Sequence, residues 1–296
     1  MSYLCTAMPV FSVILPAYNA VRFIERCFRS LQAQTFPDWE AICVDDGCRD
    51  GTGEILDRLA AEDARVRVLH KPNEGVGAAR NDALAMATGQ YVLFLDSDDF
   101  LHPQMMEICL KLAERDGSDI VAFDYDHAYR NRTILRHALH LPERMDFPRF
   151  RTFKDYEAAI TDDIFDWATE YSHHDRKLAT RHCQPWRRIY RRELVEGIGW
   201  MTGVIYEDFP WWSEVMLRVR RATLTDLPLY FYYPNRGSYI LSSREEYKVK
   251  SLQEVIRAAK KVYENVDPGI RERWNREFLR PFQTKLAKKE KRLRAK

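Results

Sequence analysis

The first 125 residues alternate short apolar runs with segments whose apolar residues recur every three or four positions. The short runs, at residues 11–15, 40–44, 66–69, 91–95 and 120–123, predict buried strands. The longer segments predict amphipathic helices, the first with Ile24, Cys27 and Leu31 on one face. Asn19 and Thr52 are expected to cap the first two helices. This alternation with short connections predicts a mainly parallel, doubly wound α/β sheet.

The regular alternation stops at about residue 125. Residues 126–185 are rich in charged, histidine and aromatic residues and predict no clear element. Beyond them the pattern predicts a helix near 209–219, a strand near 222–233 and a helix over 246–265. Residues 280–296 predict a basic helix or tail. We therefore expect the main α/β region to be followed by a smaller region and a helical C-terminus.

Polar residues stand directly after three of the predicted strands. Tyr18 follows the first, Asp46 ends the run after the second, and Asp96 and Asp98 follow the fourth. Sheets of this class bind ligands beyond the carboxyl ends of their strands. The sequence thus predicts a ligand site at that edge.

Composition narrows the function classes. The chain of 296 residues carries 46 Lys and Arg against 44 Asp and Glu, a formal net charge of +2. This balance gives no reason to expect nucleic-acid binding. Its six scattered cysteines contain no CxxC pair and predict free thiols in a reducing compartment. With no signal-peptide pattern and no apolar run of about 18 residues, we expect a cytoplasmic protein that could also contact the inner face of the cell membrane.

The tripeptide Asp96-Ser97-Asp98, followed by Asp99, concentrates carboxylates at a strand end. Carboxylate oxygens suit Mn²⁺ or Mg²⁺, which also coordinate phosphate oxygens. Such an ion could neutralise a departing diphosphate. Acidic turns after strands also cap helices, so the tripeptide alone leaves both interpretations open.

Tyr18 and Asp46 could together hold a nucleobase. A base needs a flat apolar surface, which Tyr18 offers, and an acceptor for its N–H, which Asp46 offers. The alternative is that Tyr18 packs on the sheet and that Asp46 belongs to a turn.

In the loop at residues 73–81, glycines precede a predicted helix without forming GxGxxG, so a dinucleotide fingerprint is rejected. Arg80 in that loop is interpreted as a phosphate or sugar contact, or else as a surface ion pair.

Taken in order, these pieces resemble family 2 glycosyltransferases with the GT-A fold. The chain carries PAYN at 16–19, VDDG at 44–47, NEGVGAARN at 73–81 and LDSDD at 95–99. The resemblance covers residues 10–125 closely. It extends more loosely through WRRIYRREL at 186–194 and YED at 206–208 to about residue 243.

The resemblance implies an inverting, metal-dependent glycosyltransferase (EC 2.4) acting in bacterial surface-polysaccharide or lipopolysaccharide synthesis. Tyr18 and Asp46 would contact the base, usually uracil, Asp96 would reach the ribose or donor sugar, and Asp98 would hold Mn²⁺ or Mg²⁺. Asp208 would be the catalytic base that takes the proton of the acceptor hydroxyl. Further contacts to the UDP-sugar donor would come from Pro16, Asn19, Gly75, Arg80 and Ser97.

Candidate acceptor contacts are Glu207, Trp211, Trp212 and Arg188. The two indole rings could stack on a sugar, or one of them could belong to the core. Glu207 and Asp208 could instead be acids that favour a helix N-terminus. Arg188 stands where the family often has Lys, so a phosphate or acceptor contact there could differ.

Three further features of the sequence point less clearly to a role. Cys48 stands where the family commonly has Ser, and we expect it to face solvent. Residues 236–238 match a loop that could fold over the donor. The spacing of His173, His174, His182 and Cys183 is poor for zinc, so surface or acceptor-pocket histidines are favoured.

The predicted organisation is a nucleotide-sugar-binding GT-A half at 1–125, an acceptor and catalytic-base half at 126–243, and C-terminal helices with a basic tail at 244–296. The tail, with Phe278, Phe282, Leu286 and Leu293 among its apolar residues, could lie on anionic lipid near a lipid-linked glycan acceptor, or be solvated. A non-catalytic carbohydrate-binding or assembly subunit remains the alternative function. A nucleotidyltransferase is disfavoured, because no glycine- and lysine-rich triphosphate loop is present.

Overall fold

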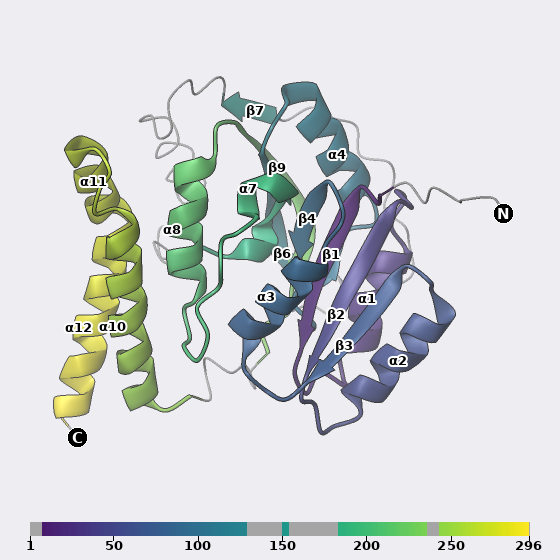
Figure 1. Cartoon of the computed structure of the whole chain (residues 1–296), viewed down its shortest axis with the longest axis horizontal. Helices are drawn as coiled ribbons and strands as arrows, with labels where there is room; N and C mark the ends of the chain where they lie inside the picture. The colour runs from purple at the N-terminus through teal and green to yellow at the C-terminus, as the bar shows by residue number, and fades with distance from the viewer. Residues whose placement is uncertain (1–7, 129–149, 154–182, 236–242, 296) are drawn as a thin grey trace.

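The computed structural model describes residues 8–128, 150–153, 183–235 and 243–295 (Figure 1). His173, His174, His182 and residues 236–238, singled out above, lie outside the described residues. The described chain folds into one sheet with helices on both faces.

The N-terminal half of the sheet is parallel. Its strands are β1 (Phe11–Ala17), β2 (Trp39–Asp46), β3 (Val66–Lys71) and β4 (Tyr91–Phe94), in the order β3-β2-β1-β4. Ile14 of β1 lies opposite Ile42 on one side and Phe94 on the other. Strands flanked on both faces by helices are mostly apolar, which is why β1, β2 and β4 show little polar alternation. The edge strand β3 also carries Arg67, His70 and Lys71 and is only partly buried. The predicted mainly parallel α/β sheet is confirmed.

The second half of the sheet is mixed. β8 (Arg188–Arg191) runs antiparallel between β4 and β6, and β9 pairs parallel with β6. β5 and β7 each pair antiparallel with β9. The bounds of these strands are β5 Phe100–Leu101, β6 Ile120–His127, β7 Phe150–Phe153 and β9 Ala222–Tyr232. β8 was not predicted, and it joins the two halves of the sheet.

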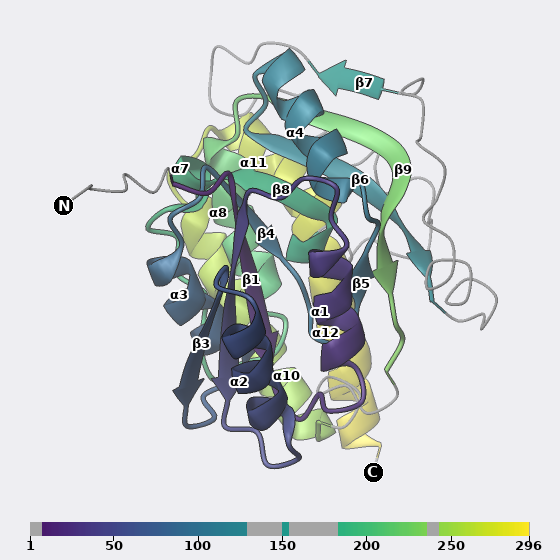
Figure 2. The same cartoon turned by 90° about the vertical axis from the view of Figure 1, so that its right-hand side faces the viewer.

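Two hydrophobic clusters lie on opposite faces of the sheet. Helices α1 (Ile24–Gln32), α2 (Thr52–Glu62) and α4 (Met105–Asp116) cover one face. Helices α3 (Val76–Met86), α7 (Arg192–Val195) and α8 (Asp208–Arg218) cover the other, and three C-terminal helices pack outside them (Figures 1 and 2). Alternate residues of each strand serve opposite faces: Val13 and Leu15 point to one cluster and Ile14 to the other.

Asn19 does not cap the first helix. That helix begins at Ile24, and Asn19 adopts a left-handed φ of 49° while its side chain accepts a hydrogen bond from the backbone N–H of Arg49 at 2.9 Å. Thr52 is the first residue of α2, where its hydroxyl accepts from the Ala20 N–H at 2.8 Å. Both side chains therefore join the loops that follow β1 and β2, because these loops meet at one edge of the sheet.

The C-terminal helices are α10 (Glu245–Val262), α11 (Pro268–Trp274) and α12 (Arg280–Arg294), with a π-helical turn at Asn275–Leu279 joining the last two. Phe282 of α12 stacks on Phe209 of α8 at 3.8 Å between ring centroids. Phe278 and Phe282 are each 2% exposed, so these two tail residues face the protein core and not lipid. None of the helices in the described parts of the chain is long and apolar enough to cross a membrane.

Candidate functional site

The carboxyl ends of β1, β2 and β4 meet at one edge of the sheet, as expected for parallel neighbours. Tyr18 follows β1 and is 50% exposed, so one side of its ring is open to solvent. Pro16 lies inside β1 and is buried opposite Val44. The structure therefore offers Tyr18 as an open aromatic surface at this edge, and Pro16 as part of the strand beneath it.

Asp46 holds the glycine-containing loop in place. One carboxylate oxygen accepts from the N–H of Glu74 and the other from the N–H of Gly75, both at 2.9 Å. The backbone carbonyl of Asp46 accepts from the Asn73 side chain at 2.9 Å. Gly75 has a φ of 90°, which favours glycine. Asp46 is 2% exposed, and any contact to a base would use the lone pairs left on these two oxygens.

The aspartates of the acidic loop after β4 differ in their burial and in their hydrogen-bond partners. Asp99 is buried, and it accepts from the Tyr230 hydroxyl and the Tyr233 N–H, each at 2.6 Å. Asp96 and Asp98 remain partly exposed. Burial, together with the charge of Asp96, raises the pKa of Asp98 to about 6. The charge of the Asp98 carboxylate is thus incompletely compensated, which a divalent cation would relieve.

Asp96 and Asp98 fit a cation that also binds a ligand. Within the described residues there is no group of three or more His, Cys, Asp or Glu placed to hold a metal by itself. Mg²⁺ is usually held by one or two carboxylates, and phosphate oxygens and water complete its shell. Ser97, between the two aspartates, is partly exposed in the same loop.

Arg80 links the acidic loop to the second half of the chain. Its guanidinium donates to Asp96 at 3.1 Å and to Glu207 at 2.7 Å, and lies 4.6 Å from the centre of the Trp200 ring. The residue is 5% exposed. Arg80 therefore does not form a surface ion pair. Its guanidinium is also not open to a phosphate in this arrangement, because it is buried and already paired with two carboxylates.

The loop before α8 is fixed to α3. Asn81 exchanges two hydrogen bonds with the backbone of Trp200, at 2.7 and 3.0 Å. A Cβ on Gly77 would lie 2.2 Å from the carbonyl oxygen of Met201, so only glycine allows this approach. Tyr206, which is buried, adopts a φ of 68°. A non-glycine residue held at positive φ is often found at functional sites, and Glu207 comes next in the chain.

Asp208 is the first residue of α8. Burial and the neighbouring charge of Glu207 raise its pKa to about 7, while Arg80 and Lys285 act in the opposite direction. The ammonium of Lys285 lies 3.9 Å from the centre of the Tyr206 ring, so α12 brings a cation to this end of α8. A carboxyl group that titrates near neutral pH can accept a proton from a hydroxyl.

Lys285 was missed by the sequence analysis, which assigned it to the basic tail. The helical spacing could have indicated its position. Lys285 follows the buried Phe282 by three residues and therefore lies on the same face of α12. Its burial lowers its own pKa.

All four predicted acceptor contacts, Glu207 included, are buried. Trp211 and Trp212 are each 1% exposed and belong to the hydrophobic cluster around α8. Trp211 stacks on Trp200 at 4.3 Å, and the Arg188 guanidinium lies 3.9 Å from the Trp212 ring centre. The predicted sugar-stacking platform is therefore wrong for this structure, because the core covers both indoles. Arg188 is itself 1% exposed and does not reach the surface.

Comparisons with known proteins agree with this geometry. The pattern of Glycosyl transferase family 2 matches residues 12–199. An uncharacterized glycosyltransferase of Bacillus subtilis, EpsJ, is 32% identical over 234 residues, which are 78% of this chain and 63% of that protein. The chain thus spans about three fifths of the length of that relative.

Two solved structures share the fold. Staphylococcus aureus TarS (residues 1–349, in complex with UDP-GlcNAc) superposes with a TM-score of 0.68 at 22% identity, covering 92% of this chain and 71% of that one. The mannosyltransferase PcManGT of Pyrobaculum calidifontis, in complex with GDP-Man and Mn²⁺, gives a TM-score of 0.57 at 19% identity, with coverages of 95% and 75%. The GT-A fold expected from the sequence is confirmed.

Proposed function

This chain belongs to glycosyl transferase family 2, and on that premise we propose that it transfers a sugar from a UDP-sugar to a saccharide acceptor with inversion. The single observation that carries the proposal is the Arg80 link between Asp96 and Glu207. These two ion pairs connect the acidic loop, which we propose binds the donor, with the start of α8, where we place the general base. A donor and a hydroxyl nucleophile held on these two sides would meet between them.

The donor is proposed to lie at the carboxyl edge of β1, β2 and β4. The exposed ring of Tyr18 supplies a surface on which a base can stack. Asp46 fixes the Glu74–Gly75 backbone and shapes the loop beside it. TarS was solved with UDP-GlcNAc and PcManGT with GDP-Man and Mn²⁺, so nucleotide-sugars are bound by this fold elsewhere. UDP is favoured here on the family resemblance.

Asp96 and Asp98 would hold Mn²⁺ or Mg²⁺, which when bound supplies a Lewis acid for the leaving diphosphate. Their partly exposed carboxylates and the raised pKa of Asp98 support this assignment. Arg80 keeps Asp96 oriented through its hydrogen bond at 3.1 Å.

Asp208 is proposed as the general base. Inversion requires the acceptor hydroxyl to attack from the face opposite the diphosphate, and the carboxylate takes its proton as the new bond forms. A pKa near 7 suits this task, since such a group is a stronger base than an ordinary aspartate yet still ionised above neutral pH. Glu207 is held by Arg80 and acts as the positioning residue beside it. The acceptor is proposed to be a glycan or glycolipid of the bacterial cell surface.

The direct test is turnover with a panel of UDP-sugars and saccharide acceptors, followed by UDP release and the anomeric configuration of the product. We expect an inverted product, and a kcat lower by about 10²–10⁴ in Asp208→Asn. Glu214→Gln, which makes the same carboxylate-to-amide change on an exposed part of α8, should keep its turnover. Retained configuration, or full activity in Asp208→Asn, would contradict the assignment. Donor binding without transfer to any acceptor would favour the non-catalytic carbohydrate-binding alternative.

A further inference from the structure

Arg26 of α1 contacts the backbone of the acidic loop that follows β4. Its guanidinium donates a hydrogen bond to the carbonyl oxygen of Asp98 at 2.6 Å, although the two residues are 72 positions apart in the chain. The bond goes to the backbone and not to the carboxylate. Among the described residues Asp98 forms no ion pair, so its carboxylate has no positively charged partner. Arg26 therefore restrains the backbone of Asp98 without occupying the group that would bind a cation.

Three aromatic rings lie around the guanidinium of Arg26. Its central carbon is 4.9 Å from the ring centres of both Phe100 and Tyr233 and 5.9 Å from that of Phe23. Cations are attracted to the faces of such rings. Tyr233 is fixed in turn, because its backbone N–H donates to the buried carboxylate of Asp99 at 2.6 Å. The rings thus hold the guanidinium in one place beside the acidic loop.

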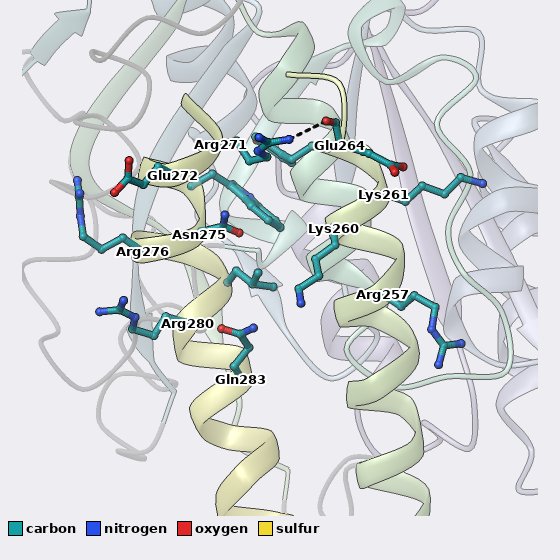
Figure 3. Close-up of a pocket in the computed structure, with 13 residues that line it drawn as sticks. Arg257, Lys260, Lys261, Glu264, Arg271, Glu272, Asn275, Arg276, Arg280 and Gln283 are labelled. Atoms are coloured by element: carbon teal, nitrogen blue, oxygen red, sulfur yellow. Dashed lines mark hydrogen bonds between the residues drawn. The ribbon is translucent and has the colours of Figure 1, made fainter. Parts of the chain in front are cut away.

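The position of Arg26 differs from that of most arginines. Long charged side chains usually extend into solvent, as Arg276 and Arg280 do on the C-terminal helices, where Figure 3 shows them pointing away from the neighbouring helix. Arg26 is instead partly buried, and its Nε–H is covered without a hydrogen-bond partner among the described residues. A buried N–H without a partner costs free energy. The contact with Asp98 is a reason for the side chain to stay there.

Other side chains hold the same loop through its backbone. The thiol of Cys27, next to Arg26 on α1, donates to the carbonyl oxygen of Asp96 at 3.6 Å. The hydroxyl of Tyr230 on β9 accepts from the Asp96 N–H at 3.3 Å and donates to Asp99 at 2.6 Å. Helix α1 and strand β9 therefore fix the loop on both sides of Ser97, and Arg26 supplies the contact at Asp98.

We propose that Arg26 is a positioning residue for the metal-binding carboxylate of Asp98. The inference rests on the proposed function, because it assumes the cation site at Asp96 and Asp98. Groups that orient a metal ligand support metal affinity without touching the metal. Charge alone predicts the opposite effect, since a guanidinium near Asp98 repels a divalent cation and its removal would strengthen binding. Positioning and charge thus make opposite predictions for one variant.

The test is calorimetric titration of the full chain with UDP over a series of Mn²⁺ concentrations at pH 8, above the pKa of Asp98. The quantity compared is the Mn²⁺ concentration that gives half of the maximal gain in UDP affinity. The test variant is Arg26→Met, which keeps an apolar side chain between the aromatic rings. The matched control is Arg29→Met, which removes the same charge from an exposed position of α1. Far-ultraviolet circular dichroism confirms that each variant is folded, and Arg26→Lys is the second variant.

We expect the half-maximal Mn²⁺ concentration to rise by at least about tenfold in Arg26→Met and to stay unchanged in Arg29→Met. Arg26→Lys should raise it by a smaller factor, because the lysine ammonium ends short of the guanidinium nitrogen that reaches Asp98. An unchanged or lower concentration in Arg26→Met, or wild-type behaviour of Arg26→Lys, would overturn the proposal. UDP binding by wild type with no effect of Mn²⁺ would instead contradict the metal site itself, so the two failures are distinguishable.

Hydrogen–deuterium exchange of residues 95–101 in EDTA gives a second readout that needs no metal. The backbone N–H groups of Asp96 and Asp99 are hydrogen-bonded in this loop, to the Tyr230 hydroxyl and to the Asp96 carbonyl oxygen. Without the Arg26 contact the loop should open more often, and these amides should exchange faster in Arg26→Met than in Arg29→Met. Equal exchange in the two variants would show that Arg26 does not hold the loop.

Discussion

Replacing Arg80 by methionine should destabilise the protein in a pH-dependent manner. Methionine keeps much of the volume of the side chain and removes its charge. Arg80 contacts Glu207 at 2.7 Å and Asp96 at 3.1 Å and is almost fully buried. The substitution would leave Glu207, itself buried, without its cation.

The magnitude follows from these two distances. At an effective dielectric constant of about 20, the two contacts correspond to gross attractions of roughly 6 and 5 kcal/mol. Desolvation of the three ions offsets much of this, and removing one partner of a buried pair typically costs about 3–5 kcal/mol. We expect a loss in that range in the free energy of unfolding near pH 8.

The pH dependence has a definite sign. Burial raises the pKa of Glu207, and the charge of Arg80 lowers it. Without Arg80 that pKa rises further above its value in the unfolded chain, so the folded variant takes up a proton as the pH falls. A protonated Glu207 carries no buried charge. The loss should therefore be smaller near pH 5 and grow as the pH rises toward 8.

The assay is urea unfolding at pH 5 and pH 8, followed by tryptophan fluorescence and circular dichroism. Arg29→Met is the matched control, because Arg29 is exposed and its pair with Glu25 should contribute below about 1 kcal/mol. A loss below about 1 kcal/mol for Arg80→Met, or the same loss at both pH values, would show that Arg80 does not compensate the buried charge of Glu207.

Three further predictions concern the base and the loop that positions it. Because the pKa of Asp208 is raised to about 7, kcat/KM should rise with pH through about 7, and a flat profile from pH 5 to 8 would argue against this base. Lys285→Gln should move the rise in kcat/KM to higher pH, because the Lys285 ammonium lowers the pKa of Asp208. Lys288→Gln, at an exposed position of the same helix, should leave the profile unchanged. Identical profiles for the two variants would exclude Lys285 from the site. Gly77→Ala should cost about 1–3 kcal/mol in urea unfolding, because its Cβ would meet the Met201 carbonyl oxygen at 2.2 Å. Gly199→Ala, with nothing within 4 Å, should change stability by less than about 0.5 kcal/mol, and equal effects of the two would show that the loop yields.

Periodicity along the chain predicted the parallel core of the sheet well. Strands β1 to β4 were each predicted within one or two residues of their observed ends. β1, β2 and β4 are buried, largely apolar runs, and β3 was found from its apolar residues Val66, Val68 and Leu69. β8 gave no comparable signal. Only Ile189 and Tyr190 are apolar among its four residues, and its two neighbours come from distant parts of the chain.

The site was predictable where it depends on strand ends. Tyr18, Asp46 and Asp96 lie at one edge because parallel strands end together. The partner of Arg80 was not predictable, since Glu207 lies 127 positions further along the chain. The positions of Trp211 and Trp212 likewise depend on residues outside their own helix. Trp211 packs on Phe94, Tyr190 and Trp200, and Arg188 lies over the Trp212 ring.

The decisive measurement for the proposed donor site is calorimetric titration of UDP with and without Mn²⁺. Wild type and Asp98→Asn are compared, with Asp126→Asn, an exposed carboxylate of β6, as the control. We expect Mn²⁺-dependent binding of UDP by wild type and control, and its loss in Asp98→Asn. No nucleotide binding by folded wild-type protein, or binding unchanged by Asp98→Asn, would contradict it.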